Sequence, residues 1–204
     1  MIKALITDYG GVLMRTRTDR TRRELEQRLG LPPHTIEDRV FASVLSTQAQ
    51  SGEISEPEFW QTLARELNLA QFALSPQAFR LEFFADDFLD GELIQFFRNA
   101  RSTFKTGLIS NAWDGLRDLL TDLWRIDDAF DVITISAEEK VMKPDARIFH
   151  TTLERLGVQA DEAIFLDDFK VNVEAANALG LKGVHFRSSE QAQRDIRALL
   201  DGNG

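Results

Sequence analysis

The chain has no cysteine among its 204 residues, and it has no long uninterrupted run of apolar residues. The first absence excludes disulfide bonds, thiolate nucleophiles and zinc sites built from cysteine. The second excludes a helix of the roughly 18–20 apolar residues that a bilayer requires, and residues 1–14 lack the pattern of a signal peptide. We therefore expect a soluble, cytoplasmic protein with no membrane partner. No pattern indicates an oligomeric state.

Positive charge is scarce as well, because 24 lysine and arginine residues stand against 33 aspartate and glutamate residues, a formal net charge of −9. General binding to nucleic acid requires a basic face, so this charge argues against such a partner. A local exception is a group of five arginines: Arg15, Arg17, Arg20, Arg22 and Arg23. Two interpretations stay open, a solvated helix face or contacts from Arg15 and Arg17 to an anionic substrate.

Residues 16–97 have a helical pattern almost throughout. Apolar residues recur at helical spacing around residues 25–31 and again around 40–45, and no strand is predicted in this region. Ser55 begins a capping-box pattern, and Ser75 precedes a proline as the N-cap of a helix does. The region is therefore predicted to be a block of helices.

After residue 100, short apolar segments alternate with amphipathic ones, which predicts parallel strands connected by helices. The expected strands are residues 104–109, 132–135, 163–166 and 183–186, and the expected helices are residues 113–124, 145–156, 171–179 and 190–200. One further strand precedes the helical block. We therefore predict an α/β core, residues 1–15 and 98–204, with residues 16–97 inserted as a helical cap and hinges near residues 14–17 and 95–99.

The most informative segment is Leu5–Val12, in which an apolar run ends at Asp8 and two glycines, Gly10 and Gly11, come before the apolar pattern resumes. This is the pattern of a buried strand that presents a carboxylate at its C-terminal end. In parallel α/β sheets, ligands bind beyond that edge. Further polar residues follow the other expected strands: Ser110, Asn111, Lys143, Asp167, Asp168 and Asn172.

These side chains have a coherent chemistry. Several carboxylates close together require a cation, and hard oxygen ligands suit Mg²⁺. A lysine can hold a phosphate and keep a carboxylate ionised, while a hydroxyl donates to a phosphoryl oxygen. A carboxylate can attack phosphorus and form an aspartyl-phosphate that water hydrolyses. The set therefore indicates phosphoryl transfer in which the protein supplies positioning and charge neutralisation.

Four motifs, in this order, resemble those of the haloacid dehalogenase-like superfamily of hydrolases: Ile6–Leu13, Leu108–Asn111, Lys143-Pro144 and Phe165–Asn172. Each motif is weak alone, and the order and the strand ends make the signal strong. The resemblance implies a Rossmann-like parallel sheet with an all-helical cap inserted after the first motif. It also implies a Mg²⁺-dependent phosphatase that acts on a small phosphorylated metabolite.

The resemblance implies a nucleophile and a set of metal ligands. Asp8 would attack phosphorus and also bind the metal, and the backbone carbonyl of Gly10 would be a second ligand. Of the paired aspartates, Asp168 would bind the metal, and Asp167 would orient Lys143 or a metal-bound water. The alternative, with Asp167 as the ligand and Asp168 as a structural residue, stays open.

The remaining motif residues would act on the phosphate and its surroundings. Ser110 would bind the transferring phosphoryl group beside Asn111, Lys143 would neutralise charge on the nucleophile and the phosphate, and Asn172 would support the loop. Structural alternatives exist for each of them. Ser110 and Asn111 have the pattern of a helix N-cap, and Lys143 that of a surface lysine at a helix entrance.

The chain departs from the commonest form of the first motif, which has an aspartate two residues after the nucleophile to protonate the leaving oxygen and activate water. Gly10 can do neither. Haloacid dehalogenases proper have tyrosine at that place. Here the tyrosine is Tyr9, which as the next strand residue is expected to point to the opposite face and pack under the sheet. Dehalogenase activity is therefore disfavoured.

Three interpretations remain. Some sugar-phosphate phosphatases of the superfamily share the glycine and a Gly-Glu-Ile-Ser segment in the cap, which is Gly52–Ser55 here. A phosphatase whose proton comes from water or a cap residue is the second. A degenerate member that binds a metal or a phosphorylated ligand without turnover is the third, and the retained nucleophile argues against it. The three tryptophans are expected in the core, and the three histidines have no assigned role: Trp60, Trp113, Trp124, His34, His150 and His185.

Overall fold

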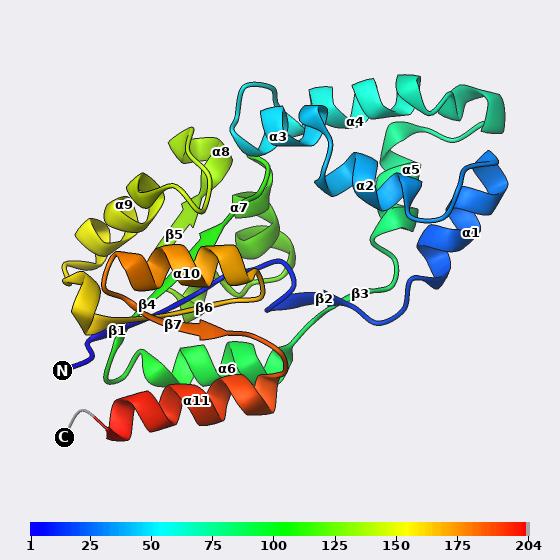
Figure 1. Cartoon of the computed structure of the whole chain (residues 1–204). Coiled ribbons are helices and arrows are strands. Elements are labelled where there is room, and N and C mark those ends of the chain that lie inside the picture. Colours follow the sequence, from blue (N-terminus) through cyan, green and yellow to red (C-terminus); the bar gives the residue numbers. More distant parts are fainter. Residues whose placement is uncertain (203–204) are drawn as a thin grey trace.

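A computed structural model describes residues 1–202. Its centre is a sheet of five parallel strands in the order β5-β4-β1-β6-β7 (Figure 1). The strands are β1 (Ala4–Thr7), β4 (Lys105–Ser110), β5 (Val132–Ile135), β6 (Ala163–Asp167) and β7 (Lys182–His185). Every pair of neighbours in this sheet is parallel, so the predicted α/β fold with a parallel sheet is confirmed. The N-terminal strand lies in the middle, buried along its whole length, because both its faces are covered by helices.

Two layers of helices cover the sheet (Figure 1). On one face lie α9 (Ala146–Leu156) and α10 (Lys170–Ala178), and on the other α6 (Gly91–Ala100) and α11 (Ser189–Asp201) lie side by side. Alternate residues of β1 divide between the layers, since Leu5 packs in the second and Ile6 in the first. The connections contain shorter pieces: α7 (Leu116–Asp118), a π-helical turn (Leu119–Leu123), α8 (Ser136–Glu139) and 3₁₀ turns at Asp127–Ala129 and Ala160–Glu162.

A separate group of helices contains its own apolar cluster. It consists of α1 (Arg20–Leu29), α2 (Thr35–Phe41), α3 (Val44–Gln50), α4 (Glu56–Glu66), a 3₁₀ turn (Leu69–Phe72) and α5 (Pro76–Phe83). Leu25, Phe59 and Leu63 are buried at its centre. Both predicted N-caps are present, because the side chain of Ser55 completes a capping box and that of Ser75 accepts from the first turn of α5. We refer to α1–α5 as the cap.

Two expectations for apolar residues were wrong. The segment around residues 40–45 is not one amphipathic helix, because Ser43 caps a new helix and breaks the segment between α2 and α3. Phe41 and Val44, at that break, are 44% and 78% exposed. Trp124 is 37% exposed, because it follows the π-helical turn at the surface instead of continuing an α-helix into the core.

The cap is connected to the sheet by two short strands that the sequence pattern did not predict. β2 (Met14–Thr16) pairs antiparallel with β3 (Asp87–Leu89), so the outgoing and returning chain lie side by side (Figure 1). Three residues are too few to show an alternating pattern, which explains why β3 was missed. Residues 95–99, expected as a hinge, lie within α6, which packs on the sheet through Leu93 and Phe97. We therefore propose that the cap ends near residue 90 instead of 97.

Candidate active site

Three neighbouring strands bring the predicted site residues to one edge of the sheet. β1 ends directly before Asp8, β4 ends at Ser110 and β6 ends at Asp167, and β1 lies between the other two. The strands are in register at this edge, because Thr7 is paired with both Leu108 and Leu166. The parallel sheet therefore gathers residues that are more than 150 positions apart in the sequence.

Lys143 lies between two buried carboxylates. Its Nζ atom is 2.8 Å from Asp8 Oδ1 and 2.7 Å from Asp167 Oδ2, and it donates a hydrogen bond to the carbonyl of Ile109 at 3.0 Å. The lysine is 4% exposed, so the alternative of a surface lysine is excluded. A buried ammonium group requires such partners, and here it connects the carboxyl ends of β1, β4 and β6.

Asp167 and Asp168 have different surroundings. The carboxylate of Asp167 is fully buried and accepts hydrogen bonds from Lys143, from Asn172 Nδ2 at 3.1 Å and from the backbone N–H of Phe169 at 2.7 Å. Among residues 1–202, Asp168 Oδ1 is buried and has no hydrogen-bond partner. Asp167 is therefore held in place by neighbouring groups, whereas Asp168 has an oxygen available for a cation. This favours Asp168 over Asp167 as a metal ligand.

Asp8, Asp167 and Asp168 each offer a carboxylate oxygen within 4.8 Å of the other two. Burial raises the pKa of Asp8 to about 8, with Lys143 acting to lower it and Asp167 to raise it further. Burial also raises the pKa of Asp168 to about 6, and the charge of Asp167 adds to this effect. Three carboxylates with one lysine leave an excess of negative charge. Together with the unpartnered oxygen of Asp168, this donor set fits a hard divalent cation.

Asn111 supports the lysine through its backbone. Its Nδ2 atom donates to the carbonyl of Lys143 at 2.9 Å, and its Oδ1 atom accepts from the N–H of Lys143 at 2.8 Å. Neither Ser110 nor Asn111 caps a helix, because α7 starts at Leu116 with Gly115 as its N-cap. Ser110 is buried at the end of β4, beside the carbonyl that receives the lysine. The helix-cap alternative is excluded.

Two residues near Asp168 were missed at the sequence level. Gly11 has a positive φ of 76°, and a Cβ atom on it would lie 2.1 Å from Asp168 Oδ2. A ring nitrogen of His185, at the end of β7, lies 2.9 Å from the backbone oxygen of Asp168. The two adjacent glycines were a signal for a close approach of this kind. The histidine contact has no local sequence signal, because it depends on strand order.

The arginines after β1 have roles in the connection to the cap. Arg15 is paired with the buried carboxylate of Asp90 and with Ser189. Arg17 lies over the ring of Phe88, 5.0 Å from its centroid. These contacts are in the β2–β3 ribbon and at the starts of α6 and α11, and none of them is to the carboxylate cluster. The structure therefore does not bring these two arginines together with the other predicted site residues.

Arg22 and Tyr9, two further residues that follow β1, are both buried. Arg22 is buried between Glu37 and Asp87, so the arginines are not all on a solvated helix face. Tyr9 is buried in the apolar cluster of the face that α6 and α11 cover, as expected, and burial raises the pKa of its hydroxyl. This side chain is therefore part of the core.

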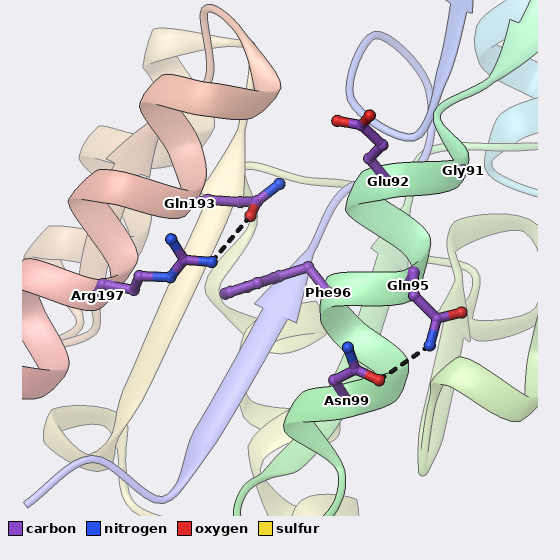
Figure 2. Close-up of a pocket in the computed structure, with 7 residues that line it drawn as sticks. All are labelled: Gly91, Glu92, Gln95, Phe96, Asn99, Gln193 and Arg197. Carbon is purple, nitrogen blue, oxygen red and sulfur yellow. Dashed lines mark hydrogen bonds between the residues drawn. The ribbon is translucent and has the colours of Figure 1, made fainter.

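A shallow groove lies elsewhere, between α6 and α11 (Figure 2). In this groove, Cζ of Arg197 lies 5.7 Å from the ring centroid of Phe96, and the side-chain amides of Gln95 and Asn99 are hydrogen-bonded to one another. The groove contains none of the residues at the carboxyl edge of the sheet. It therefore gives no second candidate for the site.

None of the helices within residues 1–202 combines the length and the apolar composition that spanning a bilayer requires.

Residues 2–180 match the family model of the haloacid dehalogenase-like hydrolases. The chain belongs to this family. Phosphatase MT3486 of Mycobacterium tuberculosis is 30% identical over 224 residues, which cover 100% of this chain and 99% of that protein. The chain covers between 7% and 37% of the first three curated relatives that it matches.

Two partial matches are to phosphatases of different substrate classes. The sesquiterpene phosphatase astK of Aspergillus oryzae is 38% identical over 73 residues, 36% of this chain and 37% of that protein. The phosphorylated carbohydrates phosphatase of Thermotoga maritima is 35% identical over 87 residues, 42% of this chain and 39% of that protein. Both names specify a phosphorylated substrate, and they differ in its organic part.

Solved structures support the fold. A predicted HAD-like family hydrolase from Porphyromonas gingivalis has a TM-score of 0.79 and 25% identity, with 98% of each chain covered. A HAD family enzyme from Bacteroides thetaiotaomicron, solved in complex with magnesium and inorganic phosphate, has a TM-score of 0.73 and 21% identity, covering 92% of this chain and 95% of that one. The Rossmann-like sheet with inserted helices is thus an architecture shared with both.

Proposed function

We propose that this protein is a Mg²⁺-dependent phosphatase of small phosphorylated metabolites that acts through an aspartyl-phosphate. The observation that carries the proposal is the buried Lys143 Nζ, 2.8 Å from Asp8 and 2.7 Å from Asp167, beside the unpartnered oxygen of Asp168. A lysine and several carboxylates at one strand edge suit charge neutralisation during phosphoryl transfer. Membership of the hydrolase family and the full-length similarity to a phosphatase support the same reaction.

In the first step, a carboxylate oxygen of Asp8 attacks phosphorus. The bond between phosphorus and the ester oxygen breaks, and its electron pair remains on the leaving oxygen, which takes up a proton. In the second step, water attacks the phosphorus of the aspartyl-phosphate, the acyl phosphate bond breaks, and the carboxylate of Asp8 and inorganic phosphate are formed. Ser110 donates to a phosphoryl oxygen, and Lys143 neutralises charge on the nucleophile and the phosphate.

The metal ligands in this proposal are Asp8, Asp168 and the backbone carbonyl of Gly10. Mg²⁺ held by these ligands would supply positive charge that offsets the negative charge of the carboxylates and of the phosphoryl group. Asp167 does not need to bind the metal, because Lys143, Asn172 and a backbone N–H occupy its oxygens. The proton for the leaving oxygen comes from water or from a cap residue, since Gly10 has no side chain.

The preferred substrates are sugar phosphates. A weakly basic leaving oxygen, such as the anomeric oxygen of a sugar 1-phosphate, needs little protonation. The segment Gly52–Ser55 that suggested them lies where the cap contacts the sheet domain, with Lys140 Nζ donating to the carbonyl of Gly52. A second substrate class is a phosphomonoester with an apolar body. The observation for it is that Phe169 and Val171, directly after Asp168, are 61% and 53% exposed. The similarity to a sesquiterpene phosphatase supports this second class.

An assay with p-nitrophenyl phosphate, with and without Mg²⁺, tests the reaction. We expect Mg²⁺-dependent release of nitrophenolate that Asp8→Asn abolishes. A second assay compares a hexose 1-phosphate with a medium-chain alkyl phosphate in the wild type and in Phe169→Ser. Selective loss of alkyl phosphate turnover in the variant supports the apolar class. Sugar phosphates are supported if the hexose phosphate is turned over faster than the alkyl phosphate and the variant turns it over as fast as the wild type does. The matched control is Phe72→Ser, an exposed phenylalanine between α4 and α5.

Two other outcomes would contradict the proposal. Binding of Mg²⁺ and phosphate without turnover of any phosphate ester would make the protein a binder. Release of chloride from 2-chloropropionate without release of phosphate from any ester would make it a dehalogenase. Asp8→Asn serves in both assays as the variant without a nucleophile.

A further inference from the structure

Trp113 belongs to the connection that follows β4, yet it is partly buried against the apolar cluster of the cap. Its ring centroid lies 5.1 Å from that of Phe59 and 5.2 Å from that of Trp60. The rings of Phe84 and Phe41 follow at 6.3 Å and 6.5 Å. We call these four cap residues the cap aromatic cluster. All the ring contacts of Trp113 are therefore to residues outside the sheet domain.

The residues after Trp113 also contact the cap. Asp114 Oδ1 accepts a hydrogen bond from the backbone N–H of Glu56 at 2.9 Å, at the start of α4. A Cβ atom on Gly115 would lie 2.1 Å from Glu56 Oε2, so the backbone of Gly115 lies close to this carboxylate. Residues 113–115 thus form one continuous contact with the N-terminal end of α4.

The residues before Trp113 lead directly to the predicted phosphate site. Asn111 is bonded through its side-chain amide to both backbone groups of Lys143, whose Nζ atom is 2.8 Å from Asp8. Ala112 donates its N–H to Ser136 Oγ at 3.0 Å, and that hydroxyl donates to the carbonyl of Gln50 in the cap at 2.6 Å. The segment 110–115 therefore has one end in the site and the other in the cap.

We propose that Trp113 is a positioning residue for the phosphate-binding segment. Anchored in the cap aromatic cluster, it holds Ser110 and Asn111 where they meet the phosphoryl group. The inference rests on the proposed function, which gives Ser110 its role. Asp8 and Asp168 follow β1 and β6, and within residues 1–202 neither is hydrogen-bonded to the segment 110–115. Asp8 accepts from the backbone N–H of Tyr9 at 2.6 Å, and the backbone oxygen of Asp168 lies 2.9 Å from a ring nitrogen of His185. Trp113 should therefore affect phosphate binding and leave Mg²⁺ binding unchanged, a difference that a merely structural role would not produce.

Isothermal titration of the intact chain tests this without requiring turnover. Mg²⁺ alone is titrated first, and inorganic phosphate is then titrated at saturating Mg²⁺. We expect Trp113→Ala to weaken phosphate binding by about tenfold or more, because a displacement near 1 Å can reduce the action of a positioned group by roughly 100-fold. Mg²⁺ binding should be as in the wild type. Trp113→Phe retains an aromatic ring in the cluster and should recover most of the phosphate affinity.

Controls separate this effect from general damage. Phe72→Ala removes an exposed aromatic ring between α4 and α5 and should change neither affinity. Asp114→Ala removes the neighbouring contact with α4, leaves every aromatic ring in place, and should weaken phosphate binding in the same direction. This variant carries the test if circular dichroism shows that Trp113→Ala does not fold.

The outcomes are distinct. Wild-type phosphate affinity in folded Trp113→Ala or, if that protein does not fold, in Asp114→Ala overturns the positioning role. Equal weakening of Mg²⁺ and phosphate in these variants also overturns it, because the effect would then be on the whole site. If the wild type binds neither Mg²⁺ nor phosphate, the proposed function fails, and this inference fails with it.

Discussion

The carboxylate of Asp168 lies so close to the backbone of Gly11 that a Cβ atom there would be 2.1 Å from its Oδ2 atom. The glycine also has a positive φ of 76°, which most side chains disfavour. By contrast, a Cβ atom on Gly10 would have no heavy atom within 4 Å in the part of the chain that the structure describes. The two adjacent glycines therefore have different reasons to be present.

Gly11→Ala should remove Mg²⁺ binding, because the added methyl group must displace the Asp168 carboxylate from the other two aspartates. The measurement is calorimetric titration with Mg²⁺. Gly10→Ala is the matched control and should bind Mg²⁺ as the wild type does. Equal Mg²⁺ affinity in Gly11→Ala and the wild type would show that Asp168 is not placed by this contact.

Gly10→Asp should increase turnover, because it adds the carboxylic acid that many relatives have two residues after the nucleophile. General acid–base catalysis contributes about 10²–10⁴-fold in typical enzymes. The increase should be large for an alkyl phosphate, whose leaving oxygen is basic, and small for p-nitrophenyl phosphate. Steady-state kcat for both esters checks this. An equal increase for the two substrates would place the gain in the attack of water on the aspartyl-phosphate, a step that both substrates share, and would contradict a role in protonating the leaving oxygen.

Lys143→Met should lower the free energy of unfolding by about 3–5 kcal/mol, since removal of one partner leaves buried carboxylates without a counter-charge. The measurement is urea denaturation in the presence of EDTA, where no metal replaces the lysine. Lys170→Met, which removes an exposed lysine at the start of α10, should change stability by less than about 0.5 kcal/mol. A folded Lys143→Met of wild-type stability would contradict the importance of this ion pair.

Metal removal should distinguish the two adjacent aspartates. Mg²⁺ at about 100 times its dissociation constant should stabilise the wild type by about 2.7 kcal/mol over the EDTA form. Asp168→Asn should lose this difference in thermal unfolding while its EDTA form stays folded. Asp167→Asn should destabilise the EDTA form, because the charge that pairs with Lys143 is lost and one acceptor oxygen becomes an N–H donor facing other donors, yet it should still respond to Mg²⁺. The reverse pattern would identify Asp167 as the ligand.

The parallel sheet and most of its helices could be predicted because apolar runs and helix caps are local. Val132–Ile135 has the predicted bounds, and the helix predicted over residues 145–156 begins at Ala146, with Asp145 as its N-cap, and ends at Leu156. β3 could not be predicted, because a three-residue strand has no periodicity of its own and exists only through pairing with β2. The π-helical turn before Trp124 likewise has no recognised local signal.

By itself, the sequence determined which residue types stand at the strand ends, and therefore the class of chemistry available to the protein. Only the tertiary structure decided which residues contact each other. Lys143 lies between Asp8 and Asp167, Asp168 lies against Gly11, and Trp113 packs against aromatic rings of the cap. The physical reason is that a strand, and the residue at its end, can be recognised from residues that are neighbours in the sequence. Contacts between loops depend instead on strand order and on the packing of the cap against the sheet, which bring together residues far apart in the chain.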